Sequence, residues 1–194
     1  MNIHDFRKRE NDVDELFISR WSPRAMSGEE IDEATLLSLF EAARWAPSSN
    51  NNQPWRFIYA RRNTPHWNVL FNLINESNQL WAKNAAVLIV VISKTTFDSG
   101  KPARTHTYDT GAAWVSLALQ GSLKGLVVHG MQGFDYDKAK EALQVPDDYS
   151  VEAMIAVGQK GKKEDLPGYL HEREFPSSRK SIAEIAMEGI FKTG

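Results

Sequence analysis

The chain has 194 residues, of which 42% are hydrophobic and 25% charged, so its composition is that of a folded protein with one substantial core. A formal net charge of −2 argues against nucleic acid and anionic membranes as partners and leaves a small molecule as the expected ligand. The absence of cysteine excludes disulfides, thiolate metal sites and thiol nucleophiles, so redox chemistry would require a cofactor.

Two features of hydropathy bear on location. The first ten residues are charged throughout and lack the apolar core of a signal peptide. The longest apolar run, Ala85 to Ile92, is too short to span a bilayer. We therefore expect a cytoplasmic protein with no membrane partner.

The first half of the chain predicts helices on either side of a polar loop. Ser27 and Glu30 have the spacing of a capping box, which predicts that a helix begins near Gly28. In chain order we expect a short helix at Asp12–Phe17, a helix from about Gly28 to Trp45, a loop to Trp55, a strand at Trp55–Arg61 and a helix at Trp67–Ile74.

In the second half, the β-branched run Ala85–Ile92 predicts a strand covered on both faces, and hence a helix layer on each side. After it we expect a helix at Tyr108–Lys124, a strand at Leu126–His129, a glycine-framed turn at Gly130–Phe134, a helix at Asp137–Leu143 and a strand at Val151–Gly158. About twenty residues after Gln159 lack periodicity and are typical of a binding loop or arm. Ser181 and Glu184 then predict a capped helix containing Ile182, Ile185 and Ile190.

The loop between Trp45 and Trp55 carries two hydroxyls and four carboxamides but no charge. Such side chains can read the hydrogen-bonding edges of a neutral ligand. The same residue types also satisfy the geometry of ordinary turns, so composition alone leaves both interpretations open.

Basic residues stand on both sides of this loop in the sequence. Arg20 and Arg24 flank Ser22, and Arg179 and Lys180 follow the irregular arm. Guanidinium groups grip a phosphate dianion through paired, charge-assisted hydrogen bonds. Neither a glycine-rich phosphate loop nor Gly-x-Ser-x-Gly is present, and the five histidines lack metal-ligand spacing, so we assign no catalytic side chain and no metal.

Four segments together resemble the FMN-dependent nitroreductase family over about Val13 to Ile190. They are Ser19-Arg20-Trp21-Ser22-Pro23-Arg24, then Ala46-Pro47-Ser48-Ser49-Asn50-Asn51-Asn52-Gln53-Pro54-Trp55, then Gly130-Met131-Gln132-Gly133-Phe134, then Ser178-Arg179-Lys180-Ser181. The resemblance implies a single domain, 1–194, of α+β class, with a mainly antiparallel sheet wrapped by helices. It also implies a homodimer with two FMN sites and a C-terminal arm, 159–194, exchanged between subunits.

The resemblance implies a role for each motif in holding the flavin. Phosphate and ribityl contacts carry over to Arg20, Trp21, Ser22 and Arg24, with Arg179 and Lys180 joining at the phosphate. Pro47, Ser48 and Ser49 are expected to approach the ring from the neighbouring subunit, Asn51 to bond the flavin of the other site, and Gln53 to support the loop. Gln132 and Gly133 are expected at the ring edge, where many relatives carry an acidic residue in place of Gln132.

The activity implied is that of a flavoprotein oxidoreductase. NAD(P)H would reduce FMN and leave, and a nitroaromatic or quinone acceptor would then take hydride at the same face. Alternatives on the same fold are dehalogenation, dehydrogenation and flavin breakdown. From a different class, a non-catalytic flavin-binding sensor also fits the residues.

Overall fold

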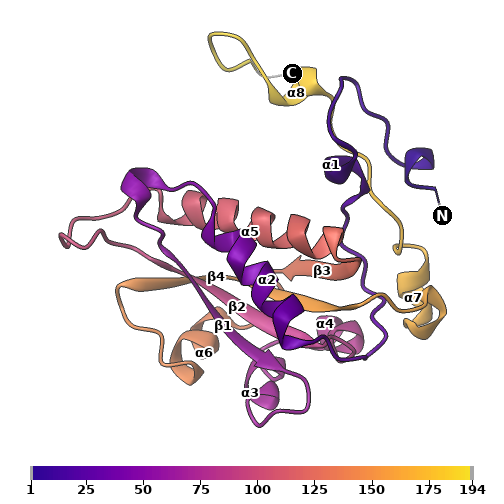
Figure 1. The fold of residues 1–194 in the computed structure, drawn as a ribbon, viewed down its shortest axis with the longest axis horizontal. Coiled ribbons are helices and arrows are strands. Elements are labelled where there is room, and N and C mark those ends of the chain that lie inside the picture. The colour runs from indigo at the N-terminus through magenta and orange to yellow at the C-terminus, as the bar shows by residue number, and fades with distance from the viewer. Residues whose placement is uncertain (1, 193–194) are drawn as a thin grey trace.

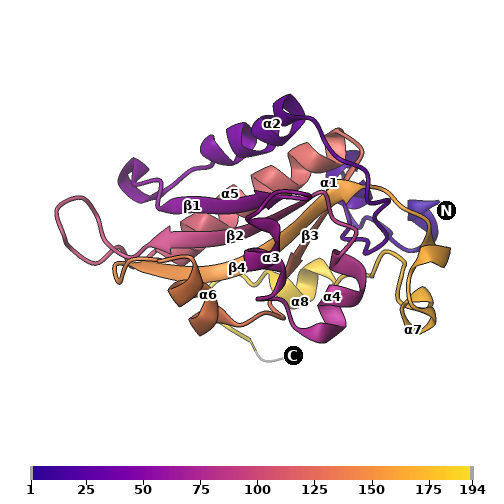
Figure 2. The same cartoon turned by 90° about the horizontal axis from the view of Figure 1, so that it is seen from below.

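Four antiparallel strands form the sheet at the centre of the molecule (Figures 1 and 2). The computed structural model describes residues 2–192. The strands lie in the order β1 (Trp55–Arg61), β2 (Val87–Lys94), β4 (Tyr149–Gln159) and β3 (Leu126–Met131). Helices cover both faces, which confirms the predicted α+β class with an antiparallel sheet wrapped by helices.

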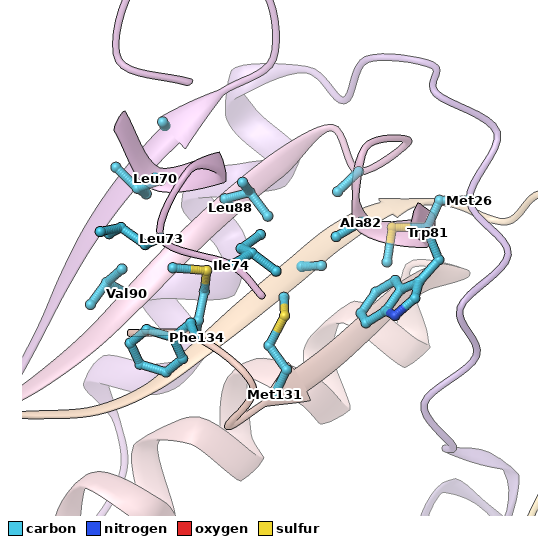
Figure 3. Packing of buried hydrophobic residues seen from close by; sticks show 14 of the residues in the cluster. Met26, Leu70, Leu73, Ile74, Trp81, Ala82, Leu88, Val90, Met131 and Phe134 are labelled. Atoms are coloured by element: carbon cyan, nitrogen blue, oxygen red, sulfur yellow. The ribbon is translucent and has the colours of Figure 1, made fainter. Parts of the chain in front are cut away.

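Strand β2 shows why two helix layers are needed. Its alternate residues Val87, Ile89 and Val91 pack with α2 (Glu33–Arg44) and α5 (His106–Leu123). Leu88, Val90 and Ile92 point to the opposite core (Figure 3). That core is covered by the short helices α3 (Trp67–Phe71), α4 (Glu76–Ala82), α6 (Tyr136–Ala142) and α7 (Gly168–His171). The predicted strand covered on both faces is confirmed.

Two glycines of α5 lie in different surroundings, one in the core and one on an open face. A Cβ added at Gly121 would lie 2.3 Å from Val128 Cγ2, so this glycine permits close packing of α5 on β3. A Cβ added at Gly111 would have no atom within 4 Å. The helix is therefore packed against the core near its C-terminal end and open along another face.

The predicted start of α2 was wrong. Asp32 caps the helix, because its Oδ1 accepts from the backbone N of Thr35 at 2.7 Å. Ser27 instead donates its backbone N–H to Gln159 O at 3.0 Å, and Met26 forms a β-bridge with Lys160. The segment before α2 thus pairs with the end of β4. No helix begins at Ser27, so its capping-box spacing caps nothing.

Other boundaries also differ from the prediction. Helix α3 ends at Phe71 rather than Ile74, and α4, capped by Asn75, was not predicted. The arm after Gln159 is not irregular throughout, because it contains a 3₁₀ turn at Lys163–Asp165 as well as α7. The capping box at Ser181 is confirmed, but the helix that follows, α8 (Ile182–Ile185), is a single turn that projects from the body (Figure 1).

Candidate functional site

A cavity of about 390 Å³ gathers arginines from distant parts of the chain; we call it the arginine cavity. The N-terminal segment, the segment after α1 (Glu15–Ser19), strand β3 and the C-terminal arm all contribute. Its lining consists of Arg7, Arg20, Trp21, Ser22, Arg24, His129, Arg173, Phe175, Ser177 and Arg179. Five guanidinium groups around one cavity make it suited to an anion.

Three of these arginines lie close enough to repel one another. Burial, and then the nearby charge of Arg179, lower the pKa of both Arg7 and Arg20. Within residues 2–192, no carboxylate forms an ion pair with Arg7, Arg20 or Arg179. A bound anion would relieve this repulsion.

Arg24 differs because Glu174 offsets its charge. Glu174 is only 4% exposed, and its Oε1 accepts from the backbone N–H groups of Arg24 at 2.8 Å and Ala25 at 2.9 Å. Its Oε2 lies 3.9 Å from Arg24 Nη1. Burial lowers the pKa of Arg24 while Glu174 raises it. The carboxylate therefore ties the C-terminal arm to the arginine motif.

His129 lines the cavity as a neutral imidazole. Its Nδ1 donates to Pro23 O at 2.8 Å, since a carbonyl oxygen can only accept. The ring packs on Trp81, with 4.6 Å between ring centroids. Burial lowers the pKa of His129 to about 4, so the ring adds no charge to the arginines at neutral pH.

Strand β3 leads from this cavity to the Gln132–Gly133 turn. The three residue steps from His129 to Gln132 span about 10 Å. Gly133 O accepts from the backbone N of Asn75 at 3.0 Å and from Asn78 Nδ2 at 3.3 Å. A Cβ on Gly133 would lie 2.5 Å from Asn78 Nδ2 and 2.6 Å from Asn75 Nδ2. The turn is thus held against α4, while the Gln132 side chain is exposed.

The polar loop after α2 has a strained, well-anchored backbone. Asn50, Asn51 and Gln53 have φ values of 51°, 55° and 46°, in the left-handed region that costs non-glycine residues energy. Ser49 donates its backbone N–H to Asp109 Oδ2 at 3.1 Å, and Gln53 donates its backbone N–H to Ser48 Oγ at 3.0 Å. Strain held in place by such contacts is typical of binding sites.

This loop and the arginine cavity lie at opposite ends of α5 (Figure 1). Asp109, which holds the loop, is in the first turn of α5, whereas Arg20 follows α1, which packs on α5 beside its other end. The 18 residues of α5 span about 27 Å. A single chain therefore does not bring its own loop to its own cavity.

The model for the Nitroreductase family matches residues 18–159, which is most of the chain. The chain belongs to the nitroreductase family. An oxidoreductase containing FMN has a TM-score of 0.93 and 46% identity to it, with 97% of each chain covered. A protein from Desulfovibrio desulfuricans, assigned as a nitroreductase and solved in complex with FMN, has a TM-score of 0.73 and 25% identity, covering 95% of this chain and 100% of that one.

An uncharacterized 15.4 kDa protein of Mycolicibacterium smegmatis is 30% identical over 146 residues, which are 69% of this chain and 95% of that one. Among residues 2–192 of this nitroreductase-family protein, no helix combines the length and apolarity needed to cross a membrane. In the same part of the chain, no three His, Asp or Glu side chains converge as a metal site would require.

The structure brings together only part of the predicted site. Arg20, Trp21, Ser22, Arg24 and Arg179 line one cavity. Gln132 and Gly133 follow the strand that leaves it. Lys180 is exposed and does not line the cavity, and Pro47, Ser48, Ser49, Asn51 and Gln53 lie at the far end of α5.

Four further residues of this nitroreductase-family protein were not predicted. Arg7 and Glu174 reach the arginine motif from the two ends of the chain, and no local pattern marks either of them. Asn78 was missed together with α4. Asp109 could have been noticed in the sequence, because acidic residues are favoured in the first turn of a helix and Asp109 lies in the first turn of α5.

Proposed function

We propose that this nitroreductase-family protein is an FMN-dependent oxidoreductase that transfers hydride from NADH or NADPH to a small acceptor such as a nitroaromatic or quinone. The arginine cavity carries the proposal. Arg7, Arg20 and Arg179 face one another there without a carboxylate partner among the described residues, which suits a phosphate monoester.

The remaining residues also fit FMN. The polar lining contributed by Ser22 suits hydroxyl groups of a ribityl chain. Gly133 lets the turn pack against Asn75 and Asn78, whose side chains occupy the space of a Cβ, and this packing holds the turn at the proposed ring edge. Gln132 offers an exposed carboxamide for the polar edge of a ring. Arg24, Trp21 and Lys180 complete the set that we propose for FMN.

When bound, FMN supplies the hydride chemistry that no amino-acid side chain can supply. The protein's own residues bind and orient it. Arg20 and Arg179 hold the phosphate end, which fixes the direction of the ligand along β3. Gln132 is neutral, so it places a hydrogen-bonding group at the proposed ring edge without adding negative charge there. No side chain is assigned as a catalytic acid or base.

We also propose a homodimer, because the site is incomplete within one chain. On α5, Tyr108, Val115 and Leu123 are 79%, 44% and 66% exposed and share one face, where Gly111 allows close approach of a partner. A twofold axis crossing this face would bring the polar loop of one subunit to the arginine cavity of the other. The loop at one end of α5 would then face the arginine cavity at the opposite end of the partner's α5.

The loop acts as one unit in this proposal. The sequence suggested that Ser49 and Asn51 serve two separate flavins. They belong to a single 3₁₀ turn, which favours one shared flavin. We therefore place the whole set Pro47, Ser48, Ser49, Asn51 and Gln53 at the partner's flavin ring. Gln53 supports the turn, since its Nε2 donates to Asn51 Oδ1 at 3.1 Å.

The exposed apolar surface of the C-terminal arm supports a proposal that the arm is exchanged between subunits. Helix α8 projects from the body, and Ile185, Ile190 and Phe191 are exposed on or just after it. Apolar residues gathered on a projecting segment indicate a protein surface that buries them. We propose the partner subunit as that surface; the cytoplasmic location stays a prediction.

Anaerobic spectroscopy of the purified protein tests the function. We expect yellow protein, bleached by NADH or NADPH and restored by a nitroaromatic or quinone. Bleaching without reoxidation by any acceptor in the panel would point to one of the other flavin chemistries. Flavin that neither nicotinamide reduces would point to a sensor, and colourless protein that takes up no added FMN would refute the proposal.

A double variant tests the assignment of the cavity. Arg20→Ala with Arg179→Ala is expected to weaken FMN binding by at least about a hundredfold, because two charge-assisted contacts are lost. Arg9→Ala with Lys162→Ala removes the same charge from exposed positions outside the cavity. FMN affinity measured by fluorescence quenching should be unchanged in that control.

A further inference from the structure

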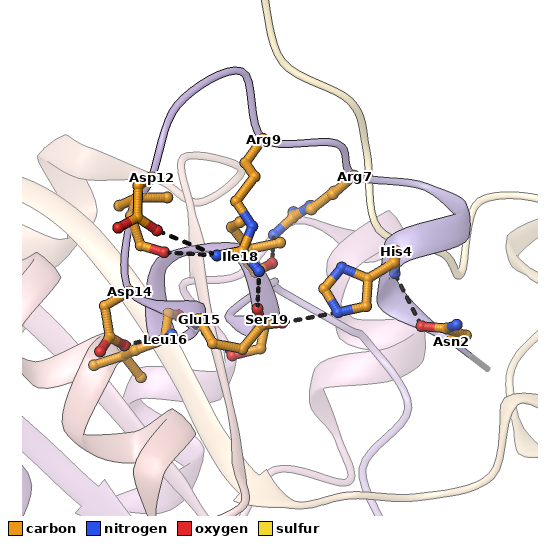
Figure 4. A network of polar contacts seen from close by, with 11 residues as sticks. Asn2, His4, Arg7, Arg9, Asp12, Asp14, Glu15, Leu16, Ile18 and Ser19 are labelled. Carbon is orange, nitrogen blue, oxygen red and sulfur yellow. Dashed lines mark hydrogen bonds and ion pairs between the residues drawn. The ribbon is translucent and has the colours of Figure 1, made fainter.

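Arg7 connects three segments that meet at the arginine cavity. It lies in the N-terminal segment, outside residues 18–159 that match the family, and it is only 9% exposed. Its Nη1 donates to Ile18 O at 2.7 Å (Figure 4). The same atom donates to Arg20 O at 2.6 Å, and Nε donates to Ser177 O at 3.0 Å. One guanidinium therefore ties the start of the family match to the C-terminal arm that follows it.

These contacts determine where the two proposed phosphate-binding arginines stand. Arg7 holds the backbone of Arg20 directly. It also holds Ser177, to which Arg179 Nη1 donates through Ser177 Oγ at 2.9 Å. Three neutral carbonyls are modest compensation for a buried charge, so an anion in the cavity would complete the surroundings of Arg7.

The lack of a carboxylate partner separates Arg7, Arg20 and Arg179 from Arg24. Arg24 has the carboxylate of Glu174 beside it. Arg7, Arg20 and Arg179 instead repel one another, and no carboxylate among residues 2–192 pairs with any of the three. A phosphate dianion would balance most of their combined charge.

We propose that Arg7 is a positioning residue for the phosphate end of the flavin site, and that it makes the protein select FMN over riboflavin. The inference rests on the proposed FMN function. It assigns the N-terminal segment a role in cofactor choice: the segment adds the third positive charge and locks Arg20 and Arg179 in place. Riboflavin lacks the phosphate, so its binding does not use this charge.

Titration of the apoprotein with FMN and with riboflavin, followed by flavin fluorescence, tests the proposal. In Arg7→Met, the dissociation constant for FMN is expected to rise by at least about tenfold, while that for riboflavin changes less than about twofold. Arg7→Lys restores the charge without the three-carbonyl geometry, so its FMN affinity should fall between those of the wild type and Arg7→Met. The matched control is Arg9→Met, since Arg9 pairs with Asp12 and Glu15 outside the cavity.

Equal loss of FMN and riboflavin binding in Arg7→Met would show a general structural role and overturn the proposal. So would an Arg7→Lys variant no better than Arg7→Met, because charge would then contribute nothing. Wild-type apoprotein that binds neither flavin would overturn the proposed function as well. Unchanged FMN affinity in Arg7→Met would overturn this inference alone.

Discussion

His129 illustrates how one residue's surroundings set its chemistry. The imidazole is packed on Trp81 and donates to Pro23 O, in a cavity already rich in arginine. Protonation would add a further positive charge there and is opposed by burial, which lowers the pKa of His129 to about 4. The neutral ring fills the space beside the arginine motif without adding to the repulsion among the arginines.

The lowered pKa of His129 makes stability depend on pH. Its folded pKa of about 4 lies below the ordinary 6.5, so the unfolded chain binds the proton first as pH falls. Between pH 7 and pH 5 this should cost the apoprotein about 2 kcal/mol of unfolding free energy. Urea unfolding at both pH values measures it, and His129→Gln should abolish this part of the dependence. A variant with the wild-type pH dependence would contradict the assignment.

Some residues of the candidate site could be predicted from the sequence, and others could not. Arg20 and Arg179 could be found because each belongs to a recognisable local motif. Arg7 and Glu174 could not, since the contacts of Arg7 with Ser177 and of Glu174 with Arg24 span 170 and 150 positions in the sequence. Long-range pairing of single charged residues leaves no local pattern for sequence reading to detect.

The elements position the arginine motif mainly through the end of β4. Gly161 donates its backbone N–H to Ala25 O at 2.9 Å, beside the bridge between Met26 and Lys160. Strand β1 was predicted with its observed bounds, because aromatic and β-branched residues end at a clear turn. The start of α2 was mispredicted because the backbone of Ser27 is engaged by β4, a tertiary contact that overrides local capping.

Substitution of Gly161 tests this attachment. A Cβ at Gly161 would lie 2.5 Å from the carbonyl carbon of Met26 and 2.7 Å from its oxygen, and backbone atoms cannot rotate away. Gly161→Ala should therefore destabilise the protein by about 1–3 kcal/mol and weaken FMN binding by moving the arginine motif. Gly168→Ala, where the new Cβ meets nothing within 4 Å, is the control and should not lower stability. Chemical unfolding and FMN titration of both variants give the comparison; equal stability would refute the attachment.

On the scale of the whole molecule, α5 both supports the sheet and separates the two halves of the proposed site. Its buried face packs on β2 and β3, while Tyr108, Val115 and Leu123 remain on the surface. Small residues in a helix allow close packing either in a crowded core or at a subunit interface. Gly121 belongs to the core, and Gly111 lies on the open face.

Charges placed on this open face should separate the subunits. Val115→Glu with Leu123→Glu is expected to give a monomer in sedimentation velocity at micromolar concentration, with FMN affinity reduced by at least about tenfold because the loop no longer reaches the cavity. Val69→Glu with Leu80→Glu alters exposed apolar residues of α3 and α4 on the opposite layer. That control should remain dimeric. A charged α5 face that still gives dimers would place the interface elsewhere.

The contact between Arg7 and Ser177 has a consequence for synthesis of the protein. The sheet strands lie between Trp55 and Gln159, so the sheet can form before Ser177 and Arg179 leave the ribosome. The arginine cavity cannot form at that stage, because its lining includes both Arg7 and Arg179. Capture of the proposed flavin would then wait until Arg179 has been synthesised, and a chain that stops before Arg179 would carry a folded sheet but no complete cavity.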